Sequence, residues 1–194
     1  GGYSVFPDDA WSNDHSGHGT HIAGIIGAQP DSTYRGIAPE ANLFGIKIYH
    51  EKDIDENGYV STDVNSVIKG IRQAIDIEAD IIVISSGITF HDEDLYEIIQ
   101  EAYRKDILII AASGNGSTSV DYPANYPEVV AVTAFDERLH PALDIIYGNE
   151  NEFAAPGVNI GGLSIPDSTY SYPYIYMSGS SQAAPHVAGL AAIL

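Results

Sequence analysis

Residues 80–112 read DIIVISSGITFHDEDLYEIIQEAYRKDILIIAA, and this stretch decides the fold class. Two almost entirely apolar runs, at residues 80–85 and 107–112, flank a segment of helical periodicity at residues 92–105. A strand whose residues are nearly all apolar is typical of a parallel sheet that is covered on both faces. The stretch therefore predicts a βαβ unit, with the right-handed crossover that such units adopt.

The charges of the segment 92–105 support a helix. Acidic residues occupy its first turn and basic residues its last, which suits the helix dipole. Its buried stripe is expected to consist of Leu95, Ile98, Ile99 and Ala102. By the same patterns, strands are expected at residues 42–49 and 129–135, and helices at residues 61–78 and from Ser181 onward. The alternation predicts one α/β domain with a mostly parallel sheet over residues 1–194.

Composition excludes several classes of function. The chain has 194 residues, 44% of them hydrophobic, and no cysteine, so disulfides, cysteine nucleophiles and cysteine-ligated zinc are excluded. With 27 acidic against 8 basic residues the net charge is −19, which argues against nucleic acid or a membrane as a partner. Cationic peptides and divalent cations fit better, although the favoured explanation of the balance is a general solubility charge or adaptation to salt. Gly1–Ser4 shows no signal peptide.

Three separated motifs carry polar groups suited to acyl-transfer chemistry. The first, GHGTHIAG at residues 17–24, places His18 at the entry to a helix, where it is exposed enough to act as a base. The alternatives are a helix start with incidental histidines, or a metal pair of His18 and His21. No further acid or histidine lies at a standard spacing for such a pair.

The second motif, GSSQAAPHVAG at residues 179–189, places Ser181 at a helix N-terminus beside free backbone N–H groups. Taken alone it also fits an ordinary serine N-cap. The third motif, AASGNG at residues 111–116, places Asn115 directly after a buried strand, where its side chain can donate to a ligand. Taken alone it also fits an Asn-Gly turn.

Together and in this order, the three motifs resemble those of the subtilisin-like serine proteases (the subtilase, or peptidase S8, family). The resemblance runs from about Tyr3 to Leu194. It implies a three-layer α/β/α fold and a serine endopeptidase, with His18 as general base, Ser181 as nucleophile and Asn115 as oxyanion donor. It also implies that substrate pairs as an added strand with Ser85, Ser86 and Gly87, and that His21 and His186 are structural.

The resemblance carries further expectations about partners. It implies protein or peptide substrates, allows a propeptide, and implies an extracellular location. It requires no cofactor for the chemistry and allows a structural calcium ion, for which the loop at residues 29–35 offers Asp31 and Ser32.

The sequence departs from the family in the acidic residues that precede His18. The family's catalytic aspartate lies in a strand followed by a D-[ST]-G motif, well upstream of the His block. The acids upstream of His18 are Asp8, Asp9 and Asp14, and none lies in such a motif; Asp14 matches a position near the S2 subsite. We therefore expect a domain that is incomplete at both ends and weakly active or inactive alone. A pseudoprotease that binds peptides or regulates a partner is the alternative.

Two smaller departures concern specificity and oxidation. Asp121 precedes Tyr122-Pro123-Ala124, and the segment that matches these residues in the family lines the base of the S1 pocket. A carboxylate there predicts a preference for Arg or Lys at P1, unless Asp121 is a turn residue that faces solvent. Gln182 stands where the family commonly has methionine, and because glutamine forms no sulfoxide we expect better tolerance of oxidants.

Overall fold

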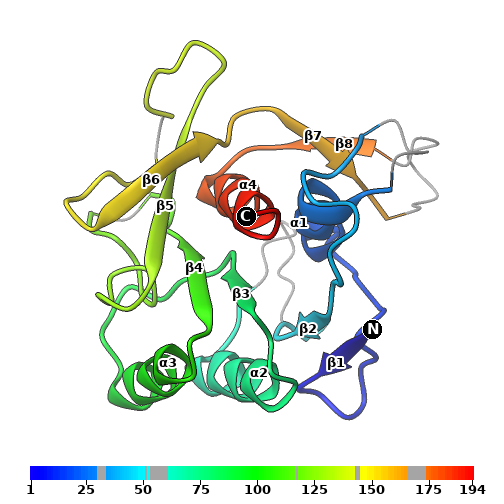
Figure 1. Cartoon of the computed structure of the whole chain (residues 1–194), viewed down its shortest axis with the longest axis vertical. Helices are drawn as coiled ribbons and strands as arrows, with labels where there is room; N and C mark the ends of the chain where they lie inside the picture. Colours follow the sequence, from blue (N-terminus) through cyan, green and yellow to red (C-terminus); the bar gives the residue numbers. More distant parts are fainter. Residues whose placement is uncertain (30–33, 51, 53–60, 117, 143–144, 166–173) are drawn as a thin grey trace.

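The computed structural model of the chain describes residues 1–29, 34–50, 52, 61–116, 118–142, 145–165 and 174–194. Helices and strands alternate through most of this length (Figure 1). In chain order the elements are β1 (Gly2–Ser4), α1 (His18–Gly27), β2 (Gly45–Lys47), α2 (Val64–Asp76), β3 (Ile81–Ile84), α3 (Glu93–Arg104), β4 (Leu108–Ala112), β5 (Val130–Phe135), β6 (Asn151–Pro156), β7 (Ile160–Leu163), β8 (Tyr174–Met177) and α4 (Ser180–Ala191).

The central sheet has the order β3-β4-β5-β6, and all of its pairs are parallel. β3 and β4 pair in register, with Ile82 opposite Ile109. The predicted α/β class with a mostly parallel sheet is therefore confirmed. The antiparallel exception is the β7–β8 hairpin, which forms a separate two-stranded sheet.

The apolar run of β4 faces two cores at once. Ile109 and Ala111 belong to a cluster that packs beneath α2 and α3, whereas Ile110 and Ala112 belong to a second cluster beneath α1 and α4. Figure 1 shows α2 and α3 along one side of the sheet and α4, with α1 beside it, on the other. Because successive side chains of a strand point to opposite faces, a strand between two helix layers must be apolar throughout.

Aspartate side chains fix where the helices of the first layer begin. Asp92 accepts a hydrogen bond from the backbone N–H of Leu95 at 2.9 Å and caps α3. Asp63 does the same for α2 through the N–H of Ser66 at 3.0 Å. Each cap satisfies one of the N–H groups that the first helical turn leaves without an acceptor. The helices predicted at 61–78 and 92–105 are therefore present, with slightly tighter ends.

β1 and β2 form a parallel pair apart from the central sheet. The strand predicted at residues 42–49 is shorter in the structure because β1 offers β2 only three partners, Gly2–Ser4. Ile46 and Ile48 nevertheless pack against the same core cluster as β3. None of the helices in the described residues is long and apolar enough to cross a membrane.

The double coverage of β4 gives a stability prediction. Ile110 is 0% exposed and Leu108, two residues earlier in the same strand, is 39% exposed. We expect Ile110→Ala to lower the free energy of unfolding by about 2–5 kcal/mol, because a cavity remains between sheet and α4. Leu108→Ala, the matched control, should cost much less. Urea denaturation of both variants measures this, and equal losses would contradict the two-core arrangement.

Candidate active site

Three chain segments meet at the carboxyl edge of the central sheet. Ser85 directly follows β3, Asn115 follows β4 after a short turn, and Ser181 is the second residue of α4. α4 packs across β3, β4 and β5 on one face of the sheet. The carboxyl edge of a parallel sheet is the usual ligand-binding edge in α/β folds. The structure thus brings Ser85, Asn115 and Ser181 together, although they are far apart in the sequence.

Ser85 and Ser181 are joined by two hydrogen bonds. The Ser181 hydroxyl donates to the carbonyl of Ser85 at 3.2 Å, and the Ser85 hydroxyl donates to the carbonyl of Ser181 at 2.9 Å. The second bond has a cause in the sequence. An α-helix would give the Ser181 carbonyl the N–H of residue 185, but Pro185 has no N–H. The free carbonyl accepts from Ser85 instead, which fixes α4 to the end of β3.

The backbone N–H of Ser180 determines which atom of the Asn115 carboxamide, the oxygen or the nitrogen, points toward it. This N–H donates to Asn115 Oδ1 at 3.0 Å. Since a backbone N–H can only donate, the atom that faces it must be the carboxamide oxygen. The Asn115 NH₂ group is therefore turned away from Ser180 and is available to a ligand. Asn115 itself is exposed, so a ligand can reach it.

The Ser180 hydroxyl adds a second connection between α4 and the turn after β4. It accepts from the Gly114 N–H at 3.1 Å and lies 3.1 Å from both the Gly114 carbonyl and Asn115 Oδ1. Gly179, just before, has φ 154° and ψ 168°, a conformation that only glycine adopts readily. A Cβ at Gly179 would also lie 3.2 Å from Asn115 Nδ2. The hydrogen bonds of Ser180 leave little freedom at the start of α4, and a side chain at position 179 would crowd Asn115.

The backbone N–H of Ser181 is the second donor of the site. It lies in the first turn of α4, where N–H groups have no acceptor within the helix. Together with the Asn115 carboxamide it can hold a negatively charged oxygen formed next to Ser181.

His18 is the first residue of α1, and α1 packs against α4. Burial lowers the pKa of His18, the charge of Asp14 raises it in part, and the neighbouring His21 lowers it. The imidazole is therefore neutral at neutral pH, as a general base must be. Within the described residues, Ser181 donates to Ser85 and no hydrogen bond joins it to the His18 ring. Such bonds are often long before substrate binds.

Asp14 caps α1 from the preceding loop. One carboxylate oxygen accepts from the Gly17 N–H at 2.9 Å, and the other accepts from the N–H and hydroxyl of Thr20, both at 2.7 Å. These bonds occupy the carboxylate with the backbone of the helix start rather than with the ring of His18. Asp14 thus stabilises the loop-to-helix entry at which His18 lies.

Asp8 and Asp9 make long-range ion pairs with the region of β2. Buried Asp9 lies 2.6 Å from Lys47 Nζ, and Asp8 lies 3.1 Å from Lys52 Nζ. Hydrogen bonds from Lys52, and then from His50, hold the pKa of Asp8 below its usual value. Both acids therefore anchor the loop after β1.

Asp121 is buried between the two segments that flank the site. A Cβ at Gly114 would lie 2.2 Å from Asp121 Oδ2, and one at Gly87 would lie 2.7 Å from Asp121 Cβ. Asp121 is 8% exposed, so the solvent-facing turn residue considered as its alternative is wrong. The carboxylate can approach these two backbones because both positions are glycine.

The remaining predicted substrate-binding residues differ in accessibility. The Ser86 hydroxyl accepts from Tyr49 at 2.6 Å and is partly exposed. Ala124 is fully buried in the core cluster beneath α2 and α3, so its side chain supports the segment from within. The binding roles of Ser85, Ser86, Gly87, Asp121 and Ala124 stay predictions.

His21 and His186 are held by backbone carbonyls. His21 Nε2 lies 3.0 Å from the Ile160 carbonyl, and His186 Nδ1 lies 2.7 Å from that of Gln182. The His21 ring connects α1 to β7, whereas the His186 ring bonds to a carbonyl one turn earlier within α4 itself. The metal pair considered for His18 and His21 gains no support, because the described residues contain no group of three metal-ligating side chains. Asp31 and Ser32 lie outside the described residues.

The sequence motifs did not predict what Ser180 and Pro185 do in the site. Ser180 stood next to the predicted nucleophile, and only the structure shows that it fixes the Asn115 carboxamide. Pro185 did carry a readable signal, since a proline four residues after Ser181 always leaves the Ser181 carbonyl without its helical donor.

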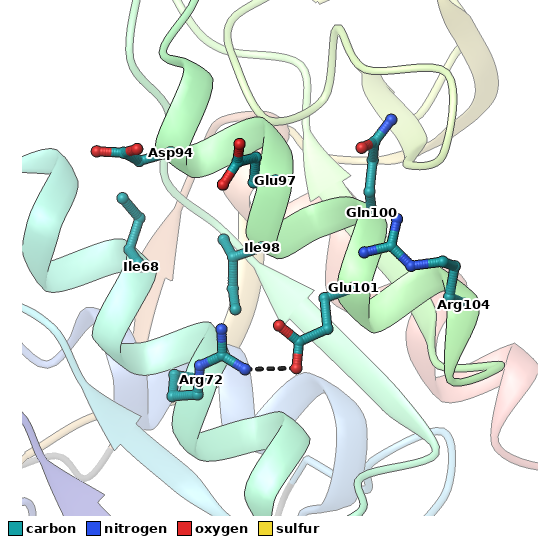
Figure 2. A pocket seen from close by; sticks show the side chains of 8 residues that line it. All are labelled: Ile68, Arg72, Asp94, Glu97, Ile98, Gln100, Glu101 and Arg104. Atoms are coloured by element: carbon teal, nitrogen blue, oxygen red, sulfur yellow. Dashed lines mark hydrogen bonds and ion pairs between the residues drawn. The ribbon is translucent and has the colours of Figure 1, made fainter.

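A separate cavity lies away from this site. It occupies about 370 Å³ in a surface groove between α2 and α3, on the opposite face of the sheet from α4 (Figure 2). Arg72 of α2 and Glu101 of α3 form an ion pair across it. Its walls are mostly charged, and no residue of the three motifs lines it.

Comparison with known proteins assigns almost the whole chain to one family. The model of the subtilase family, peptidase S8, matches residues 4–194. The minor extracellular protease Epr of Bacillus subtilis (strain 168) is 41% identical over 198 residues, which cover 100% of this chain and 29% of that protein. A thermostable alkaline protease of Halalkalibacterium halodurans is 40% identical, with 100% of this chain and 51% of that protein covered. The chain thus spans about half or less of these two relatives.

Solved structures agree with the sequence comparison. The prenylagaramide maturation protease PagA has a TM-score of 0.81 and 30% identity, covering 99% of this chain and 66% of that one. A mutant of the protease domain of PatA has a TM-score of 0.83 and 30% identity, covering 100% of this chain and 70% of that one.

The buried histidine of α1 gives a pH prediction. Burial lowers the pKa of His21, which is 0% exposed, although its bonds to the carbonyls of Ile160 and Ile175 raise it in part. The unfolded chain therefore takes up a proton at about pH 6.5 that the folded chain binds less well. The stabilisation from neutral His21 is complete above that pH and is lost as the pH falls below it.

We expect the free energy of unfolding to fall between pH 7.5 and pH 5, with up to about 1.4 kcal/mol per pH unit due to this one group. His21→Gln should flatten the slope, and His140→Gln, at an exposed site, should not. Denaturant titrations at several pH values measure this. An unchanged slope in His21→Gln would show that His21 is not held neutral by the fold.

Proposed function

Because the chain belongs to the subtilase family, we propose that it is the catalytic part of a serine endopeptidase, with Ser181 as nucleophile. The observation that carries the proposal is the orientation of Asn115. Its oxygen is engaged by the Ser180 N–H, so its NH₂ group is left to donate beside Ser181. An ordinary helix start needs no such arrangement, whereas acyl transfer needs a donor aimed at the developing oxyanion.

In the proposed reaction, Ser181 Oγ attacks the carbonyl carbon of the scissile peptide bond. His18 removes the hydroxyl proton and later gives it to the leaving amine. The Asn115 carboxamide and the Ser181 N–H donate to the oxyanion. The acyl group on Ser181 is then released by water, which His18 activates in the same way.

We propose that the substrate lies extended along Ser85–Gly87. These residues continue past the end of β3, beyond its paired positions in the central sheet. A peptide can therefore add to their backbone as an extended strand, whether or not another strand pairs with β3 itself. Ser85 is also hydrogen-bonded to Ser181. A peptide bound there lies close to the nucleophile.

A carboxylate that orients His18 completes this chemistry in enzymes of this type. Among the described residues, the nearby acid, Asp14, is instead occupied by Gly17 and Thr20. The described sheets leave β2 without a neighbour on the side away from β1, and β3 without one on the side away from β4. We propose that a further parallel strand joins these two edges and carries the orienting carboxylate.

The alternative function is a pseudoprotease that binds peptides in the same site. The hydrogen bonds of Asp14 favour this alternative. They engage its carboxylate with Thr20, so that among the described residues Asp14 does not orient His18. A fluorophosphonate probe distinguishes the two, since only an activated serine reacts with it. Robust peptide-amide hydrolysis by residues 1–194 alone, lost in Ser181→Ala, would contradict the need for a further carboxylate.

The biological setting is proposed from the relatives. One of them is named an extracellular protease, and on that basis we propose that this chain also acts outside the cell on protein or peptide substrates. A propeptide partner and a structural calcium ion stay predictions. Neither nucleic acid nor a membrane is proposed as a partner, given the net charge of −19.

The catalytic assignment predicts the effects of two substitutions. Ser181→Ala should abolish labelling by a fluorophosphonate probe, and Ser119→Ala, at an exposed serine, should leave it unchanged. Asn115→Leu should lower kcat for amide hydrolysis by about 10²–10³, the effect of losing one oxyanion donor. Labelling and hydrolysis assays measure both. A normal rate in Asn115→Leu would exclude the carboxamide as a donor.

The position of Asp121 supports a preference for basic residues at P1. Its buried carboxylate lies between the backbones of Gly87 and Gly114, one on the proposed substrate segment and one next to Asn115. A P1 side chain entering between these segments would meet this charge. An Arg or Lys there would form a charge-assisted hydrogen bond, which Phe cannot.

We expect kcat/KM for an Arg P1 substrate to exceed that for Phe, and Asp121→Asn to reduce the Arg rate by about 10–100-fold, the effect of losing a hydrogen bond to a charged group. Asp94→Asn, in the groove between α2 and α3, is the matched control. A pair of fluorogenic peptides that differ only at P1 measures the ratio. Equal rates for Arg and Phe in the unmodified protein would remove this assignment.

A further inference from the structure

Met177 is the one methionine of the chain, and it ends β8 three residues before the start of α4. It pairs with Ile160 in the β7–β8 hairpin and is partly exposed, so small oxidants in solvent can reach it. From Met177 the chain runs through Ser178 and Gly179 to the segment that carries Ser181.

The sulfur of Met177 contacts the residue that follows the proposed nucleophile. Gln182 Nε2 donates to Met177 Sδ at 3.8 Å, and Gln182 is 2% exposed. Buried amide N–H groups normally find an oxygen acceptor, and a thioether is a weak substitute. The side chain next to Ser181 is therefore held by a group whose acceptor strength depends on its oxidation state.

We propose that Met177 is a reversible oxidation site, and that its oxidation shifts the start of α4 through Gln182. A lone pair of Sδ attacks one oxygen of a peroxide; the S–O bond forms as the O–O bond breaks. The leaving oxygen takes up a proton and departs as water or an alcohol. Sulfur is oxidised by two electrons and the peroxide is reduced by two. Methionine sulfoxide reductases reverse the change.

The sulfoxide alters the contact in two ways. Its oxygen is a strong acceptor in place of a weak one, and it occupies additional space between Met177 and the Gln182 amide. Gln182 has little room to adjust, because it is almost completely buried, with 2% of its surface exposed. The displacement therefore passes to the backbone around Ser181. Gln182 itself forms no sulfoxide, but its side chain contacts the sulfur of Met177. Sensitivity to oxidants is therefore retained through Met177.

The effect on Ser181 rests on the proposed function, and its size follows from positioning. A shift of about 1 Å at a reacting group can cost roughly a hundredfold in rate. We expect hydrogen peroxide to add one oxygen atom to the intact protein and to slow fluorophosphonate labelling of Ser181 by about tenfold or more. Treatment with a methionine sulfoxide reductase should restore the rate. Met177→Leu should label equally fast before and after peroxide.

A second readout does not depend on reactivity. The NMR resonance of the Gln182 side-chain amide, assigned by its loss in Gln182→Leu, should move on oxidation in the unmodified sequence and not in Met177→Leu. If the untreated protein fails to label, the proposed function fails, and this resonance alone decides the oxidation site. Oxidised protein that keeps both its labelling rate and the Gln182 resonance would overturn the proposal.

Discussion

The hydrogen bond from the Ser180 N–H to Asn115 Oδ1 is the constraint on which the site depends. It joins the start of α4 to the turn after β4 and fixes which end of the carboxamide faces the site. The Ser180 hydroxyl reinforces it through Gly114, and Gly179 provides the unusual backbone that lets α4 begin there. The proposed oxyanion site would therefore be in place before any substrate binds and would require no reorganisation during the reaction.

The fold supplies the rigid frame for this bond. β4 is buried on both faces, so the turn that carries Asn115 leaves the sheet from a fixed position. α4 is held from the other side by Ser85, because Pro185 leaves the Ser181 carbonyl free to accept from it. Two contacts, one to the end of β3 and one to the end of β4, thus place Ser181 on the sheet edge. Pro185 thus removes one hydrogen bond within α4 and leaves the Ser181 carbonyl to form a tertiary hydrogen bond with Ser85.

Local patterns were enough to predict most of the fold. The apolar runs at residues 80–85 and 107–112 predicted buried parallel strands because β3 and β4 have helices on both faces. The helix at residues 92–105 was predicted within a residue at each end, since Asp92 is its cap. Features that depend on distant partners could not be predicted in this way. The short β2 is limited by β1, and the buried place of Asp9 depends on Lys47, which lies far along the sequence.

The same distinction applies to the site. Motif order indicated His18, Asn115 and Ser181, whereas the orientation of Asn115 follows from one tertiary bond that no motif encodes. The most direct test is a crystal structure of the protein with a peptide boronic acid bound to Ser181. The account predicts that one boronate oxygen lies about 2.7–3.1 Å from both Asn115 Nδ2 and the Ser181 backbone N. A boronate oxygen that faces solvent, with the Asn115 NH₂ group turned elsewhere, would contradict it.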